Sequence, residues 1–180
     1  MTNPIYNSVY GSLKRSLIHT STYSENGLAM RVGLAVLDTI ENEDLERRAT
    51  ENGEYLRTRL RQLLAGFEMV DDVRGAGMFN GIAFKSPRRL SLRASFEAFT
   101  RIHPAMFGQV LIMRLFRDHG VLTQICGNNF MVLKVAPPLI ATHEQLDRCA
   151  EAMREVVSLA HKPTEFWTEA LHLAVRAANV

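Results

Sequence analysis

The chain has 180 residues, of which 47% are hydrophobic and 22% are charged, and its formal net charge is +2. This composition is that of a globular chain with a buried core rather than of a disordered one, and so small a net charge argues against nucleic acid as a partner. The apolar runs are too short to cross a bilayer, and the first residues carry no secretory signal, so no membrane partner is expected.

The first predicted helix runs from about residue 25 to residue 41, after a stretch in which Asn3-Pro4 is expected to open a turn. Hydroxyl and amide side chains gather just ahead of this helix, and Thr22 and Glu25 have the spacing of a capping box. Unpaired backbone amides at the start of a helix also attract anions. The pattern therefore leaves two interpretations of Thr22, a plain helix cap or part of an anion site. The apolar stripe of the helix comprises Leu28, Val32, Ala35, Val36 and Thr39.

A second helix is predicted from a cap at Asn42 to Gly66. Its apolar side comprises Leu45, Ala49, Leu56, Leu60, Leu63 and Leu64. Its solvated side comprises Glu43, Glu46, Arg47, Arg48, Arg57, Arg59 and Arg61. Two strands are then predicted over residues 69–73 and 78–85, joined by a glycine-containing turn over 74–77. For Arg74, bonding to the carbonyls of its own hairpin is favoured over facing a cleft.

Residues 88–106 are interpreted as a connection between elements rather than as a loop that closes over a substrate. A third helix is predicted over residues 108–119, with Gly120 as its left-handed end. Two more strands are predicted over residues 121–126 and 130–135. A fourth helix follows, capped by Thr142 with Gln145 closing a capping box, and a last helix is predicted to begin at Pro163. The predicted class is α+β: a small antiparallel sheet with helices packed on one side.

Four segments resemble the class III aminotransferases, pyridoxal-phosphate (PLP) enzymes that include ornithine and acetylornithine aminotransferases. These segments are His19–Asn26, Gly27–Leu45, Val73–Gly81 and Lys134–Leu146. They occur in the family's order over about residues 5–160, and they correspond to its C-terminal portion only. The resemblance implies that residues 1–24 are the end of the large cofactor domain or a linking segment. It implies that residues 25–180 are the C-terminal small domain of a fold-type-I PLP aminotransferase.

The resemblance also implies a function, a cofactor and site residues. The complete enzyme would use PLP to move an amino group from an amine or amino acid to a keto acid, as a homodimer. Ser21 and Thr22 match positions that contact the cofactor phosphate of the neighbouring subunit. Lys134 matches a position where many relatives have an arginine that binds the substrate carboxylate. This departure leaves three interpretations: a different carboxylate geometry, an amine donor without an α-carboxylate, or a lysine that only borders a strand.

None of the four lysines, Lys14, Lys85, Lys134 and Lys162, matches the Schiff-base lysine of the family, which lies upstream of the segment at His19. No catalytic residue is therefore assigned, and the chain alone is expected to be inactive without a large domain or second subunit. Two alternatives stay open: a PLP aminomutase or decarboxylase of the same fold, and a non-catalytic interaction module derived from the small domain.

The histidines and cysteines predict no metal site. The six histidines include no i,i+4 pair and have no neighbouring cysteine. Cys126 and Cys149 are far apart in the sequence, which argues against a disulfide framework or a zinc ribbon. The expected compartment is the reducing cytoplasm.

Overall fold

The computed structural model describes residues 2–15, 22, 26–162, 166–169 and 171–172. The chain divides into two compact units, residues 1–43 and residues 44–180, which we call the N-terminal unit and the C-terminal unit. The predicted boundary after residue 24 falls at residues outside those described, so it stays a prediction.

The described residues of the N-terminal unit include three helical elements. They are α1 (Asn3–Tyr10), the 3-10 turn η1 (Leu13–Arg15) and α2 (Gly27–Asn42). Asn3-Pro4 begins α1 instead of opening a turn, because proline fits the first turn of a helix, where its missing N–H has no intrahelical acceptor. Among the described residues, none of α2 is buried.

The cap of α2 is Asn26 rather than Thr22. The Asn26 side-chain oxygen accepts a hydrogen bond from the Ala29 backbone N–H at 3.1 Å. Asn26 directly precedes the first helical residue, which is the position from which an amide oxygen reaches the third backbone N–H. The interpretation of Thr22 as the cap was therefore wrong.

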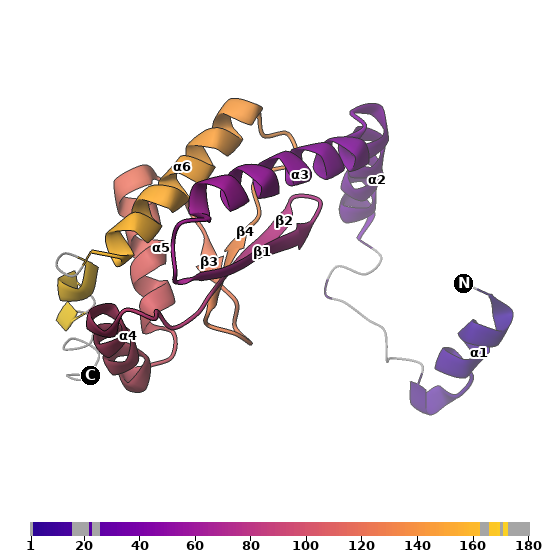
Figure 1. Ribbon diagram of the computed structural model, residues 1–180. Helices are drawn as coiled ribbons and strands as arrows, with labels where there is room; N and C mark the ends of the chain where they lie inside the picture. The colour runs from indigo at the N-terminus through magenta and orange to yellow at the C-terminus, as the bar shows by residue number, and fades with distance from the viewer. Residues whose placement is uncertain (1, 16–21, 23–25, 163–165, 170, 173–180) are drawn as a thin grey trace. The chain divides into compact units, whose positions relative to one another are not determined.

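The described residues of the C-terminal unit form a four-stranded antiparallel sheet of order β1-β2-β4-β3. Figure 1 shows α3 and α6 lying along the same side of this sheet. This arrangement confirms the predicted α+β class. The elements are α3 (Leu45–Leu64), β1 (Val70–Ala76), β2 (Phe79–Phe84), α4 (Leu90–Ile102), α5 (Met106–His119), β3 (Gln124–Ile125), β4 (Val132–Val135) and α6 (His143–Ala160).

The core lies between the sheet and the helices. The apolar side predicted for the second helix is confirmed, since Leu56, Leu60 and Leu64 of α3 are fully buried. They belong to one cluster with Ile82 and Leu133 of the sheet. Removal of this apolar surface from water is the main force that holds the unit together.

Helices α3 and α6 are also joined by polar contacts at the rim of the core. The Tyr55 hydroxyl donates to the Asp147 carboxylate at 2.8 Å, and the Arg59 guanidinium donates to the same carboxylate at 2.9 Å. The hydrogen bond from Tyr55 is the main cause that lowers the pKa of Asp147 below its usual range. Asp147 is therefore a charged link between the two helices at neutral pH.

The helix ends test several sequence predictions. The capping box of Thr142 and Gln145 at the start of α6 is confirmed, and Gly120 ends α5 with a φ of 65°. The predicted cap at Asn42 is wrong, because Asn42 is the last residue of α2. Asp44, with a left-handed φ of 49°, precedes α3 instead. Asp44 is one of the residue types that tolerate this conformation best.

Residues 88–106, which were predicted as a connection between elements, contain the helix α4. In α4, Leu92, Phe96 and Phe99 are buried, so this segment is part of the core as well as a connection. The last predicted helix is confirmed where it is described: residues 166–169 are helical, and Phe166 and Trp167 are buried.

Candidate functional site

The face of the sheet that is not covered by α3 and α6 carries a row of residues from all four strands. Arg74 in β1 lies opposite Gly81 in β2, and Gly81 lies opposite Lys134 in β4. Lys134 also pairs with Gln124 in β3. Side chains alternate between faces along a strand, so this row points away from the buried face that carries Ile82. We call these residues, Arg74, Gly81, Lys134 and Gln124, the cross-strand row.

Two hollows lie along the cross-strand row. The larger measures about 630 Å³ and the smaller about 450 Å³. Lys134 and Phe79 border both hollows, whereas Arg74 borders only the larger one. The larger hollow is lined further by Gly75, Asn80, Gly81, Cys126, Gly127, Asn128, Asn129 and Val132.

The charges on this face are mainly positive near the row. Arg74 pairs with Asp72 on its own strand at 3.2 Å, and both side chains are exposed. Among the described residues, Lys134 has no carboxylate within ion-pair distance. A lysine ammonium beside an open hollow can bind an anionic group of a ligand, because no internal partner competes for it.

The backbone of the strands holds Lys134 in place. The Thr123 hydroxyl, just before β3, donates a hydrogen bond to the Lys134 carbonyl. The flanking residues Leu133 and Val135 are buried on the opposite face. The position of Lys134 therefore depends on a rigid strand rather than on a loop.

The turn between β1 and β2 is secured by Arg57 of α3. Its guanidinium donates to the Gly77 carbonyl at 2.9 Å and to the Asn80 side-chain oxygen at 2.8 Å. It also pairs with Glu54, which lowers the pKa of that carboxyl. Two interpretations are corrected by these contacts: Arg57 is buried rather than solvated, and the hairpin carbonyl is bound by Arg57 rather than by Arg74.

Two glycines shape this contact: Gly53 permits the close approach of α3, and Gly77 permits the conformation of the turn. Gly77 has a φ of 50°, in the region that favours glycine. A Cβ on Gly53 of α3 would lie 1.9 Å from the Gly77 carbonyl oxygen. The strand β1 extends to Ala76, so Arg74 and Gly75, predicted as part of the turn, belong to the sheet. This extension is what places Arg74 in the cross-strand row.

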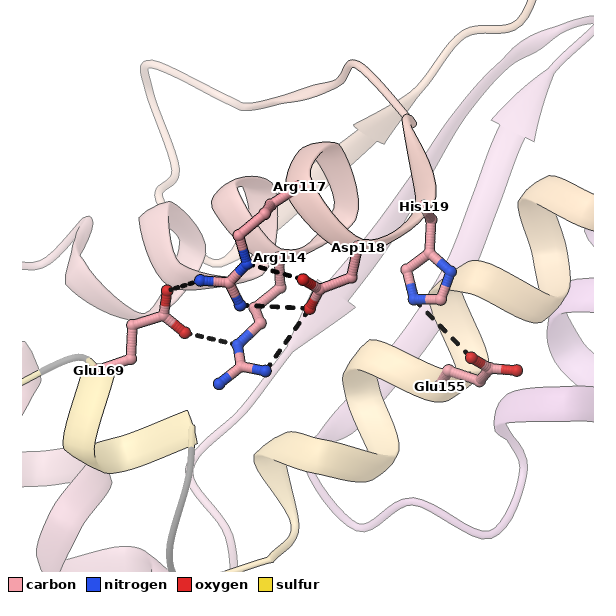
Figure 2. A network of polar contacts seen from close by, with 6 residues as sticks. All are labelled: Arg114, Arg117, Asp118, His119, Glu155 and Glu169. Carbon is pink, nitrogen blue, oxygen red and sulfur yellow. Dashed lines mark hydrogen bonds and ion pairs between the residues drawn. The ribbon is translucent and has the colours of Figure 1, made fainter.

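A separate polar cluster lies on α5 (Figure 2). Glu169 accepts hydrogen bonds from Arg114 and Arg117, and Arg117 also donates to Asp118 at 2.7 Å. The bond from Arg117 is the main cause that lowers the pKa of the Asp118 carboxyl. Every charge drawn in this cluster is paired, so its role is to attach residues 166–169 to α5.

Of the three site residues that the sequence predicts, the structure describes two. Ser21 lies outside the described residues. Thr22 is described and exposed, and it belongs to the N-terminal unit. Lys134 belongs to the C-terminal unit, where it is half-buried in the cross-strand row. The predicted role of Thr22 and Ser21 in phosphate binding stays a prediction.

The described residues do not form a complete PLP site. Lys14 and Lys162 are exposed, and Lys85 is exposed and paired with Asp71 at 3.0 Å. Lys134 borders the hollows, but the hydroxyl of Thr123 in their lining donates to the Lys134 carbonyl, and no described helix start with free amide donors lines them. No described lysine therefore combines an enclosed site with a phosphate cup.

Among the described residues, no group of histidine, cysteine and acidic side chains could hold a metal ion. Within the same residues, no helix is long and apolar enough to cross a membrane.

The residues that sequence reasoning missed are Arg74 and Gly81 as neighbours of Lys134. The alternation Asp72-Val73-Arg74 was visible in the sequence and is typical of a strand with one buried face. The register that aligns these residues with Lys134 was not visible, because pairing between distant strands is not encoded in a local pattern.

Known proteins resemble this chain over most of its length. A family model described as aminotransferase class-III matches residues 2–157. The chain is 35% identical over 133 residues to alanine–glyoxylate aminotransferase 2 homolog 2 of Arabidopsis thaliana, a match that covers 74% of this chain and 26% of that protein. It is 29% identical over 140 residues to the ornithine aminotransferase of Oceanobacillus iheyensis, covering 78% and 29%.

Solved structures agree with these matches. An ornithine aminotransferase of Plasmodium yoelii superposes with a TM-score of 0.62 at 27% identity, covering 79% of this chain and 32% of that one. The chain thus spans about a quarter to a third of the length of these relatives. From the family match and the shared fold, we conclude that this chain belongs to the class III aminotransferase family.

Proposed function

We propose that the chain supplies the small-domain side of the substrate cleft of a PLP-dependent aminotransferase. Class III aminotransferases use PLP, which provides the electron-withdrawing ring for amino-group transfer when it is bound. In this proposal Lys134 binds the carboxylate of the amino donor or of the keto acid. The observation that supports it is the position of Lys134, half-buried on a rigid strand and bordering both hollows.

The lysine that holds PLP would come from a part of the enzyme outside these 180 residues. The four lysines of the chain are unsuited to that role, as described above. The chain alone would therefore not transfer amino groups. Ser21 and Thr22 would contact the cofactor phosphate bound in the neighbouring subunit of a homodimer, as the resemblance to the family implies. This assignment uses hydroxyl donors, which suit a phosphate oxygen.

The alternative of a non-catalytic interaction module is favoured by one feature, the exposed apolar residues of α2. Leu28, Val32 and Leu37 are each more than half exposed. Exposed apolar surfaces of this kind mark sites of contact with other proteins or with other parts of the same protein. The feature is equally expected of a helix that packs against the rest of an enzyme, so it does not displace the enzyme proposal.

The role of Lys134 can be tested by titrating the chain with pentanoate while its backbone amides are followed by NMR. Pentanoate is expected to shift amides of the cross-strand row, and Lys134→Gln is expected to weaken its binding about tenfold, since a charge-assisted hydrogen bond contributes about 1.5 kcal/mol or more. Lys85→Gln is the matched control, because it removes the same charge from the exposed end of the sheet. Equal binding by both variants would refute the assignment of Lys134.

A further inference from the structure

The sequence contains three Asn-Gly pairs, which are Asn26-Gly27, Asn52-Gly53 and Asn80-Gly81, and the first two share the tripeptide Glu-Asn-Gly. An asparagine followed by glycine is chemically labile, because glycine has no side chain to hinder an attack of its backbone nitrogen on the asparagine side chain. Since Asn26 and Asn52 have the same neighbours in the sequence, a difference in reactivity between them has to come from the fold.

Asn26 lies at the exposed start of α2, a helix in which no residue is buried. Its side-chain oxygen accepts the Ala29 backbone N–H, and this hydrogen bond polarises the carbonyl carbon, Cγ, that an attack would meet. Gly27 is the first residue of the helix, so its own backbone N–H has no acceptor within the helix. The backbone rotation that brings the two groups together disturbs only the first turn of α2, and helix ends open most easily.

Asn52 lies in the interior of α3, and both ends of its side-chain amide are bound. Its Nδ2 donates to the Ala141 carbonyl at 3.3 Å, and its Oδ1 contacts His143 Nε2 at 3.2 Å. Gly53 is buried, and its backbone N–H belongs to the hydrogen-bond ladder of the helix. The same rotation at Asn52 would therefore break α3 in the middle.

Asn80 lies in the sheet, where its side chain is 2% exposed. Its Oδ1 accepts a hydrogen bond from Arg57 at 2.8 Å. Gly81 lies on β2, which is paired with β1 on one side and with β4 on the other. A rotation at Asn80 would separate strands in the core of the C-terminal unit, so this pair is protected as well.

We propose that Asn26 is a site of spontaneous deamidation in the folded chain, whereas Asn52 and Asn80 are not. The Gly27 backbone nitrogen gives its proton to hydroxide and attacks Cγ of Asn26. The Cγ–Nδ2 bond breaks, and Nδ2 takes a proton from water and leaves as ammonia. Water then opens the cyclic imide, either at Cγ to give aspartate or at the backbone carbonyl to give isoaspartate. Nothing is oxidised or reduced, and this modification is independent of the proposed function.

The two products have different effects on the start of α2. Aspartate keeps an oxygen that can accept the Ala29 N–H, and its negative charge suits a helix N-terminus. Isoaspartate adds a methylene group to the main chain and moves the acceptor away from the helix. Both products lower the formal net charge of +2 by one, so deamidated chains can be separated from unaltered ones by charge.

The test incubates the folded 180-residue chain at mildly alkaline pH, digests it at acidic pH and measures conversion at the three asparagines by mass spectrometry. Asn26 is expected to be converted, with aspartate and isoaspartate as separate peptides. Asn52 and Asn80 are expected to be converted at least about a hundredfold more slowly, because folded units open with equilibrium constants of about 10⁻³ or less. In urea, Asn26 and Asn52 are expected to react at equal rates, since they share their neighbours.

Gly27→Ala is the variant that tests the attacking atom. A Cβ on Gly27 meets no atom within 4 Å, so alanine fits the fold, and its methyl group hinders the backbone nitrogen. Most of the conversion at Asn26 is expected to be lost in this variant, and a well-dispersed amide spectrum shows that it is folded. If Asn26 reacts no faster than Asn52 in the folded chain, or if Gly27→Ala is converted at an unchanged rate, the proposal is overturned.

Discussion

Arg57 shows how a single residue can contradict its sequence pattern. It occupies a position that helical spacing assigns to solvent, yet it is 7% exposed. The reason is the turn at Gly77, whose carbonyl needs a donor on the side facing α3. The neighbouring Asn80 is also buried, and its side-chain nitrogen has no hydrogen-bond partner among the described residues. Arg57 is thus the donor for the Gly77 carbonyl oxygen and for the Asn80 side-chain oxygen beneath this turn.

Replacement of Arg57 should therefore destabilise the C-terminal unit strongly. Arg57→Ala leaves the Gly77 carbonyl and the Asn80 oxygen without their donor, and a loss of about 2–4 kcal/mol in the free energy of unfolding is expected. Urea denaturation of the variant and of the unaltered chain measures this loss. Arg47→Ala on the same helix is the control, because Arg47 is exposed and its ion pairs with Asp44 and Glu51 lie in water. Similar losses in the two variants would contradict the role given to Arg57.

Residue identity predicted some contacts and not others. Lys134 became a candidate through the resemblance of the segment Lys134–Leu146 to the family, in which many relatives have an arginine at this position. The sequence interpretation assigned the hairpin carbonyls to Arg74 and placed Arg57 on the solvated side of its helix, whereas Arg57 makes the contact. Only the three-dimensional approach of α3, made possible by Gly53 and Gly77, decides which of them reaches the carbonyl.

At the scale of elements, local chemistry predicted two helix ends correctly and missed two others, at Thr22 and Asn42. The capping box at Thr142 and the left-handed glycine at Gly120 are local signals, and both were confirmed. The strand predicted over residues 121–126 was confirmed only for Gln124–Ile125. Strand length depends on the partner strand, and β4 itself spans only Val132–Val135. Local β propensity cannot show where a partner ends.

The capping box gives a prediction for α6. In Thr142→Ala, the Gln145 backbone N–H loses the side-chain oxygen that it donates to, and α6 loses its start signal. A decrease of about 1 kcal/mol in the free energy of unfolding is expected. Thr50→Ala is the matched control, because Thr50 is exposed within α3 and its hydroxyl donates only to the preceding turn. The control should be neutral or slightly stabilising, since alanine is the better helix former.

Two outcomes of this comparison are informative. If thermal or urea unfolding shows no difference between Thr142→Ala and Thr50→Ala, the cap makes no net contribution to the free energy of unfolding. If Thr142→Ala alone loses stability, the start of α6 is fixed by its own sequence and not only by packing on α3.

At the scale of the whole molecule, the pH dependence of stability should reflect the carboxylates that link its elements. The pKa of Asp147 is lowered in the folded state, chiefly by the hydrogen bond from Tyr55. A group with a lowered folded pKa stabilises the fold above its unfolded pKa, and this stabilisation is lost as the pH falls through the folded pKa. Stability should therefore decrease below about pH 4, the range in which an aspartate of an unfolded chain titrates.

The variant Asp147→Asn isolates this contribution. It is expected to be less stable than the unaltered chain at pH 7 and to show a smaller further loss between neutral and acidic pH. Denaturant midpoints measured across this range give the comparison. Asp38→Asn in α2 is the control, since Asp38 is exposed and belongs to the other unit. If the denaturant midpoints of Asp147→Asn depend on pH in the same way as those of the unaltered chain, the link between α3 and α6 does not depend on this charge.

The described residues of the two units support the proposal that this chain needs a further part of the enzyme for activity. The C-terminal unit carries a cationic face with two hollows, which is suited to binding carboxylates. Neither unit, in its described residues, offers a lysine that is enclosed with phosphate donors. The chain covers 26% of one full-length relative and 29% of another. The proposal that the cofactor-binding lysine lies in another part of the enzyme follows from these observations.

The most direct test of this central proposal is reductive trapping of PLP on the chain. The 180-residue chain is mixed with PLP, reduced with borohydride, digested, and its four lysines are examined by mass spectrometry. The account predicts slight labelling spread over the exposed lysines, and no lysine labelled in proportion to the protein. Stoichiometric labelling of one lysine, Lys134 above all, would contradict it, because the chain would then hold the cofactor by itself.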